Sequence, residues 1–143
     1  MSLNIYLTFD GNCEEAFDFY KSVLGGEFIA KQRFSDGPPE MAGVAKDELN
    51  RLMHVTLSFA GGVLQGSDTA KGHAETYVRG NNFSINYSPP LRADADVAFA
   101  KLKEGGVETM PMQETFWGSY FGMCTDRFGV QWMINYALET NAG

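Results

Sequence analysis

Few residues of this 143-residue chain are suited to chemistry. His54 and His73 are its only histidines, and Cys13 and Cys124 are its only cysteines. His54 alternates with apolar neighbours in a strand-like segment, so it is expected on the polar side of that strand. An imidazole there serves as a ligand or general base, or as a hydrogen-bonded structural residue. The cysteines form no Cys-x-x-Cys pair, so neither a zinc site nor a dithiol motif is expected.

An aromatic segment between two predicted strands is the second chemical feature. It contains Trp117, Tyr120 and Phe121, with Gly118 among them. Large rings with polar edges suit the binding of a planar or amphipathic ligand. The same rings also close a core or form a dimer contact, and both interpretations stay open. Trp132, by contrast, is expected to pack under a helix.

The first of two helical segments covers residues 16–24 and ends at the pair Gly25-Gly26. Asn12 is expected to cap this helix with its side chain. Glu14 and Glu15 are adjacent and therefore diverge on a helix. They are expected on its solvated first turn, where the helix dipole favours them, rather than as a catalytic pair.

The second helical segment starts near Asp94 or Asp96 and also ends at a glycine pair, Gly105-Gly106. A helix and a glycine pair repeated at half the chain length indicate two copies of one supersecondary unit, with a cleft between them as the place for a site. The apolar pattern of the second helix is continued by Val97, Ala100 or Lys101, and Leu102.

Alternating residues predict strands around both helices. Polar residues 67–80 are expected to link two modules, 1–68 and 81–137, within a single domain of residues 1–143. The prediction is an α+β fold of two βαβββ modules with the helices on the outer face. Residues 41–50 are weakly patterned and are expected to be only partly ordered. The predicted strands are 3–9, 27–34, 52–59, 63–66, 83–87, 107–112, 119–125 and 130–136.

Charge and composition argue against several classes of partner. The net charge is -7, and an acidic surface repels phosphate backbones, so no nucleic acid is expected. No basic run suits an anionic membrane surface, and no apolar stretch is long enough to cross a bilayer. The first residues lack the pattern of a signal peptide, so a cytoplasmic location is expected.

Motifs in order along nearly the whole chain resemble one known family. They include 9–17, 53–55, 62–68, 80–85, 110–118, 120–122 and 125–132. These segments resemble the vicinal oxygen chelate superfamily, which includes glyoxalase I, bleomycin-resistance proteins and extradiol dioxygenases, and more specifically its PhnB-like branch. The resemblance implies two modules whose sheets curl into an incomplete barrel around a cleft, and a homodimer in many members.

Metal-dependent members of that superfamily hold a divalent ion with His, Gln or Glu side chains on the concave face. By position, the resemblance places Tyr6 (or Ile5), Gln65, Ser84 and Met133 there. This set suits a divalent cation poorly, because only Gln65 is a plausible ligand. No metal and no other cofactor is therefore expected.

The function expected from these observations is a metal-free small-molecule-binding protein of the glyoxalase/bleomycin-resistance type. The alternative is a divalent-metal-dependent enzyme, glyoxalase-like or dioxygenase-like, with Gln65 as a weak metal ligand and His54 as a ligand or base. A third possibility is a dimer without a ligand. The candidate ligand-binding residues are Tyr6, His54, Gln65, Ser84, Asn86, Trp117, Tyr120 and Phe121.

Overall fold

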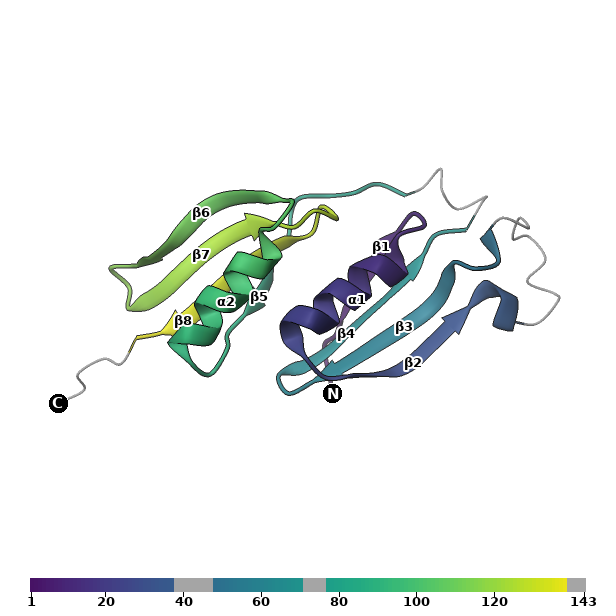
Figure 1. Cartoon of the computed structure of the whole chain (residues 1–143), viewed down its shortest axis with the longest axis horizontal. Coiled ribbons are helices and arrows are strands. Elements are labelled where there is room, and N and C mark those ends of the chain that lie inside the picture. The colour runs from purple at the N-terminus through teal and green to yellow at the C-terminus, as the bar shows by residue number, and fades with distance from the viewer. Residues whose placement is uncertain (38–47, 71–76, 139–143) are drawn as a thin grey trace. The chain divides into compact units, whose positions relative to one another are not determined.

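The structure of the protein is a computed structural model that describes residues 1–37, 48–70 and 77–138. The chain divides into two compact units, residues 1–78 (unit 1) and 79–143 (unit 2) (Figure 1). His73 and residues 41–47 lie outside the described residues. Each unit has the predicted order of strand, helix and three strands. The elements are β1 (Ile5–Phe9), α1 (Cys13–Leu24), β2 (Glu27–Arg33), the 3-10 turn η1 (Phe34–Asp36), β3 (Leu52–Phe59), β4 (Gly62–Asp68), β5 (Ile85–Tyr87), α2 (Arg92–Leu102), β6 (Val107–Glu114), β7 (Ser119–Thr125) and β8 (Gln131–Ala137).

The two sheets have the same topology. The strand order is β1-β4-β3-β2 in unit 1 and β5-β8-β7-β6 in unit 2. In each, the first strand is parallel to the last, and the other neighbours are antiparallel. The α+β fold of two βαβββ modules is therefore confirmed.

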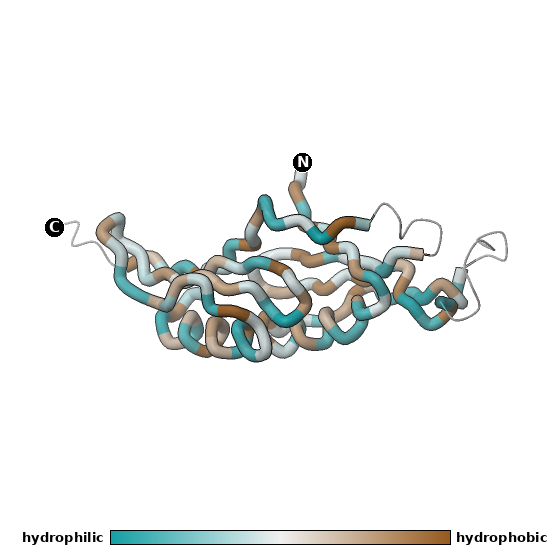
Figure 2. Tube along the Cα trace, turned by 90° about the horizontal axis from the view of Figure 1, so that it is seen from above, coloured by the Kyte–Doolittle hydropathy of each residue, from teal (hydrophilic) through white to brown (hydrophobic). Residues whose placement is uncertain are grey.

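The core of unit 1 lies between α1 and one face of its sheet. Phe17 and Tyr20 of α1 are fully buried, as are Val55 and Leu57 of β3. Gly66 of β4 makes this packing possible, because a Cβ there would lie 2.6 Å from the Phe17 ring. Figure 2 shows the hydrophilic and hydrophobic residues interspersed along both helices, as expected for helices with one buried face.

The core of unit 2 corrects the predicted face of its helix. Val97 is 53% exposed and Ala100 is exposed, so neither faces the sheet. Of the predicted positions, only Leu102 is buried. The helix turns its smaller and aromatic side chains inward over β7 and β8, where Trp132 is buried as predicted. The buried residues of α2 are Ala95, Ala98, Phe99 and Leu102.

Two predicted boundaries also move. Strand β4 continues through Asp68, and Asp68 and Thr69 are buried, so the link between the modules starts later than residue 67. Strand β5 begins at Ile85 rather than Phe83. The backbone carbonyl of Phe83 instead accepts a hydrogen bond from the side chain of Gln131 at 2.6 Å.

The cap of α1 is a further correction. Asn12 makes no side-chain capping bond. The carboxylate of Asp68 accepts hydrogen bonds from the backbone N–H groups of Gly11 and Cys13, at 2.8 and 3.0 Å, and from that of Leu52 at 3.0 Å. A residue distant in sequence thus caps the helix and ties it to the start of β3. Among the helices of the described residues, none has the length and apolarity needed to cross a membrane.

Candidate functional site

The open face of unit 1, which is the sheet face opposite α1, carries a row of polar side chains. Tyr6 of β1 is paired with Gln65 of β4, and Gln65 is paired with Thr56 of β3. Residues paired across neighbouring strands project from the same side of a sheet. The alternation along β1, β3 and β4 therefore places these side chains away from the buried Leu7, Val55 and Leu64.

His54 stands beside this row with both ring nitrogens bonded. Its Nδ1 lies 3.3 Å from the hydroxyl of Tyr6, and its Nε2 lies 2.8 Å from the hydroxyl of Thr56. In either neutral tautomer, one ring nitrogen donates its hydrogen and the other accepts from a hydroxyl. The three side chains form a fixed hydrogen-bonded chain, and the sequence placed Tyr6, His54 and Gln65 on this face without identifying Thr56.

The Gln65 amide differs from these three side chains in its hydrogen bonding. It is half-buried, and its side chain has no hydrogen-bond partner within residues 1–37, 48–70 and 77–138. An amide offers two donated hydrogens and an accepting oxygen. Gln65 therefore offers this face donors and an acceptor that are not engaged by other described residues.

The open face of unit 2, opposite α2, holds some of the other predicted residues. Asn86 is paired with Met133 on this side and is exposed, and Ser84 lies half-buried just before β5. The ring centroids of Trp117 and the buried Phe121 are 5.9 Å apart, in an edge-to-face contact. Trp117 itself is 56% exposed. These two rings are brought together, as the aromatic segment suggested.

Tyr120 does not belong with them. Its ring lies 4.0 Å below the guanidinium of Arg92, and its hydroxyl donates to the carboxylate of Asp96; both partners are on α2. Adjacent strand residues point to opposite faces, so Tyr120 and Phe121 cannot share one. Tyr120 is removed from the set of candidates that share an open face.

The open face of unit 2 also contains residues that the sequence analysis missed. Met110 is paired with Met123, and Met123 is paired with Met133, so three thioethers lie in one row across β6, β7 and β8. Asn135, paired with Phe121, has a buried side-chain oxygen without a hydrogen-bond partner in the described part of the chain. The alternation within each strand was readable from the sequence, but the pairing that assembles the row was not.

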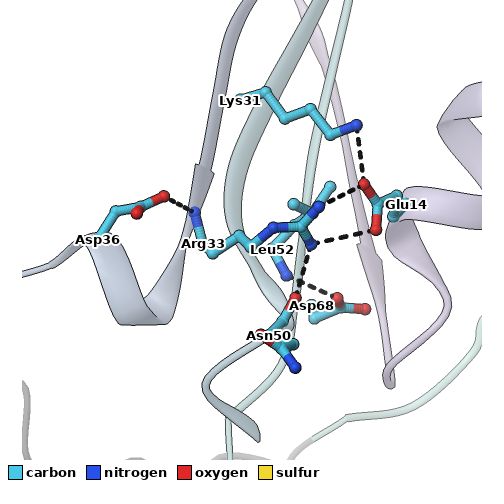
Figure 3. Close-up of polar contacts among 7 residues, drawn as sticks. All are labelled: Glu14, Lys31, Arg33, Asp36, Asn50, Leu52 and Asp68. Carbon is cyan, nitrogen blue, oxygen red and sulfur yellow. Dashed lines mark hydrogen bonds and ion pairs between the residues drawn. The ribbon is translucent and has the colours of Figure 1, made fainter.

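A polar depression of about 650 Å³ lies at one end of unit 1. Arg33 donates to both carboxylate oxygens of Glu14, at 3.1 and 2.6 Å, and to the backbone carbonyl of Asn50 (Figure 3). Arg51 donates to Asp10 and to the backbone carbonyl of Thr69. Both arginines are thus engaged in holding elements of unit 1 together. The depression is lined by Gly11, Glu14, Arg33, Asn50, Arg51 and Asp68.

The sequence predicts Glu14 on a solvated helix turn, but the structure places it in ion pairs. Lys31 forms a second ion pair with it at 2.8 Å (Figure 3). The hydrogen bonds from Arg33 and Lys31 lower the pKa of Glu14 to about 2. A carboxyl with that pKa stays ionised at neutral pH, so Glu14 serves as an anchor for β2 rather than as a proton donor.

The two cysteines are free and buried. Desolvation raises the pKa of Cys13, and desolvation with the nearby carboxylate of Asp126 raises the pKa of Cys124 to about 11. The thiolate is the reactive form, so neither thiol is suited to nucleophilic or redox chemistry.

Comparison with known proteins adds to this geometry. Residues 2–134 match the model of the Glyoxalase/Bleomycin resistance protein/Dioxygenase superfamily. The chain belongs to this superfamily. It is 31% identical to Protein YjdN of Escherichia coli over 146 residues, which cover 97% of each chain.

Two solved structures have the same fold as this chain. Protein PA1353 of Pseudomonas aeruginosa is 38% identical, with a TM-score of 0.80 over 96% of this chain and all (100%) of that one. The PhnB protein of Bacillus cereus, 24% identical, shares the fold with a TM-score of 0.76 over 96% of this chain and 100% of its own. The expected likeness to the PhnB-like branch is thereby confirmed.

The side chains on the open face of each unit are poor ligands for a divalent ion. No group of three or more His, Cys, Asp or Glu residues suited to a metal occurs in the part of the chain that the structure describes. On the open face of unit 1, both nitrogens of His54 are committed to hydroxyls, which leaves the Gln65 amide as a weak ligand. On that of unit 2, Met133 offers a soft thioether.

Proposed function

We propose that this member of the glyoxalase superfamily is a metal-free binding protein that takes a small polar molecule at the open face of unit 1. The observation that carries the proposal is the Gln65 amide, which has no partner among the residues that the structure describes and lies beside the bonded chain of Tyr6, His54 and Thr56. Fixed hydroxyls and one unsatisfied amide are the kind of polar groups that orient a small ligand.

The side chains of this row carry no formal charge when His54 is neutral, so the favoured ligand is uncharged and rich in hydroxyl or carbonyl groups. Such a ligand gains hydrogen bonds from Gln65 in exchange for water, without displacing a partner among the described residues. We use hydroxyacetone as the probe, because it offers one hydroxyl and one carbonyl.

The test follows the side-chain amide signals of ¹⁵N-labelled protein during titration with hydroxyacetone. We expect the Gln65 amide to shift, and Gln65→Leu to weaken binding by about tenfold, because it removes hydrogen bonds at matched size. Gln113→Leu in unit 2 is the matched control and should leave the affinity unchanged. Shifts that persist undiminished in Gln65→Leu would contradict the proposal.

The divalent-metal-dependent enzyme is the alternative that a second measurement separates. Melting temperature is recorded with Mn²⁺, Ni²⁺ and Zn²⁺, since an ion bound to the folded state raises it. No change agrees with metal-free binding. A rise that is lost in both Gln65→Ala and His54→Ala would favour the metalloenzyme instead.

We also propose that the protein forms a homodimer and acts in the cytoplasm. Homodimerisation rests on the family resemblance, and light scattering coupled to size-exclusion chromatography tests it by giving the mass in solution. Fractionation of cells tests the cytoplasmic location.

A further inference from the structure

The polar depression of unit 1 lies where β4 ends and β3 begins, beside the first turn of α1. Its volume of about 650 Å³ is that of an ordinary small-molecule pocket. Tyr6, His54 and Gln65 do not line it. The depression is therefore separate from the polar row on the open face of the same unit.

Arg51 lines this depression with donors to spare. Its Nη1 donates to the carboxylate of Asp10 at 2.8 Å and to the backbone carbonyl of Thr69 at 3.0 Å, which uses both hydrogens of that nitrogen. The Nε–H and the two Nη2 hydrogens have no partner among the described residues. Nε–H and one Nη2 hydrogen form a parallel pair that binds a carboxylate through two hydrogen bonds. The side chain is 27% exposed, so such a carboxylate can take the place of water.

The guanidinium of Arg51 is held in place before any ligand binds. Its Nη1 is fixed by the two acceptors, and one of its faces rests on Gly11. A Cβ built on Gly11 would lie 3.1 Å from Nη2, 3.2 Å from Cζ and 3.5 Å from Nε, so the group lies flat against that backbone. The N–H donors therefore point along the plane of the group, and little side-chain freedom remains to be lost on binding.

The charges around the depression select among carboxylate ligands. Arg33 and Arg51 line it together with Glu14 and Asp68, so the formal charges of the lining cancel. Asp68 also takes up backbone N–H groups at the start of α1, which would otherwise attract an anion. A phosphate or sulfate would face two carboxylates without a net positive charge. A ligand that carries one carboxylate and one ammonium group has no net charge and suits this lining better.

From these observations we propose that the depression binds a free α-amino acid as its zwitterion. The carboxylate of the amino acid bonds to Nε and Nη2 of Arg51. The ammonium group lies toward Glu14, whose side chain is 39% exposed, with the exposed Asn50 at the rim. A long peptide carries its two charges at opposite ends, so its terminus supplies only one of them. The inference goes beyond the proposed function and does not depend on it.

The experiment follows the Nε–H signals of the five arginines in the full ¹⁵N-labelled chain. Through-bond correlations to the backbone assign the signal of Arg51. The probes are L-alanine, propionate, which is the same molecule without the ammonium group, and ethylammonium, which is the same molecule without the carboxylate. Sodium chloride keeps the ionic strength constant. Arg92, which pairs with Glu114 in unit 2, is the internal control.

We expect L-alanine to shift the Arg51 signal, to leave that of Arg92 in place, and to bind about three- to tenfold more tightly than propionate. Ethylammonium should not shift the Arg51 signal, because it has no group that accepts from the guanidinium. These comparisons use the wild-type protein, so they need no variant to fold. Equal affinities for L-alanine and propionate would overturn the assignment of a zwitterion. A shift of Arg51 with ethylammonium would do the same for the assignment of Arg51 to the carboxylate.

A pair of variants tests Arg51 itself. Arg51→Lys should weaken the binding of L-alanine by about tenfold, because lysine keeps the charge and loses the parallel donors. Arg92→Lys is the matched control and should bind as the wild type does. Unchanged affinity in Arg51→Lys would overturn the role of Arg51.

Absence of a shift at Arg51 with L-alanine at tens of millimolar would overturn the proposal as a whole. Failure of the proposed function is a separate result, because it is read from Gln65 with hydroxyacetone. Gln65→Leu should bind L-alanine as tightly as the wild type does, and a loss of binding in this variant would contradict the placement of the amino acid in the depression.

Discussion

The indole N–H of Trp132 donates a hydrogen bond to the carboxylate of Asp126 at 2.9 Å inside unit 2. Asp126 is 3% exposed and begins the turn between β7 and β8. Its other oxygen accepts from the backbone N–H groups of Phe128 and Val130, at 2.9 and 3.0 Å. One buried carboxylate thus fixes both the last turn of the module and the tryptophan beneath α2.

Replacing Asp126 should therefore be severe. We expect Asp126→Ala to lower the free energy of unfolding by about 3 kcal/mol or more, because it leaves buried donors without their acceptor. Urea unfolding followed by circular dichroism measures the change. Asp94→Ala, in the exposed first turn of α2, is the control and should cost about 0.5 kcal/mol through the helix dipole alone. Equal losses in the two variants would show that the carboxylate network contributes little.

Two glycine pairs, Gly25-Gly26 and Gly105-Gly106, follow the two helices. Their members differ in whether a side chain would be opposed by a positive φ, by a clash of its Cβ, or by both. Gly25 has φ of 75° and open space where a Cβ would lie, whereas a Cβ at Gly106 would lie 2.1 Å from the carbonyl oxygen of Thr125. Gly26 combines both, with φ of 87° and 2.0 Å from its would-be Cβ to the carbonyl oxygen of Ser58. The equivalent contacts of Gly26 and Gly106 occur at β3 and β7, the corresponding strands of the two modules.

We predict that Gly26→Ala destabilises the protein more than Gly25→Ala. The Gly25 variant should lose about 1–3 kcal/mol from backbone conformation alone. The Gly26 variant should lose at least about 2 kcal/mol more, because a backbone carbonyl must move, and Gly106→Ala reports that clash without a positive φ. Thermal and urea unfolding measure the three variants. The explanation would be wrong if Gly25→Ala and Gly26→Ala unfolded alike.

The lowered pKa of Glu14 predicts a pH dependence of stability. Its folded pKa is about 2 against an ordinary value of 4.5, so the unfolded state binds the proton more readily. The ion pairs therefore stabilise the fold fully above about pH 4.5, and this contribution is lost as the pH falls toward 2. The side chain is 39% exposed, so screening limits the contribution to about 1 kcal/mol.

Urea unfolding at pH 7 and pH 3.5 tests this in wild type, Glu14→Gln and Glu15→Gln. Glu14→Gln should be less stable than wild type at pH 7 and closer to it at pH 3.5. Glu15 is exposed on the same turn and makes no ion pair in the described residues, so Glu15→Gln should lose only the small helix-dipole contribution, as Asp94→Ala does. A constant gap between Glu14→Gln and wild type would refute the assigned cause.

Local patterns in the sequence were enough to predict much of this protein. Alternation with a period of two places a side chain on one face of a strand wherever the strand is paired, so the open-face positions of Tyr6, His54 and Gln65 followed from the sequence and the resemblance together. The same rule places Tyr120 and Phe121, which are neighbours in one aromatic segment, on opposite faces of the sheet. The repeated helix and glycine pair indicated the two modules, because a helix and the glycines after it can be recognised from short stretches of sequence.

Tertiary structure decided which distant residues meet. The carboxylate of Asp68 caps α1 and holds β3 because the parallel pairing of β1 with β4 brings residue 68 beside residue 9. The methionine row exists because β6, β7 and β8 pair in one particular alignment. The hydrogen bonds and packing that select such an alignment form between segments far apart in the chain, so no local pattern encodes them.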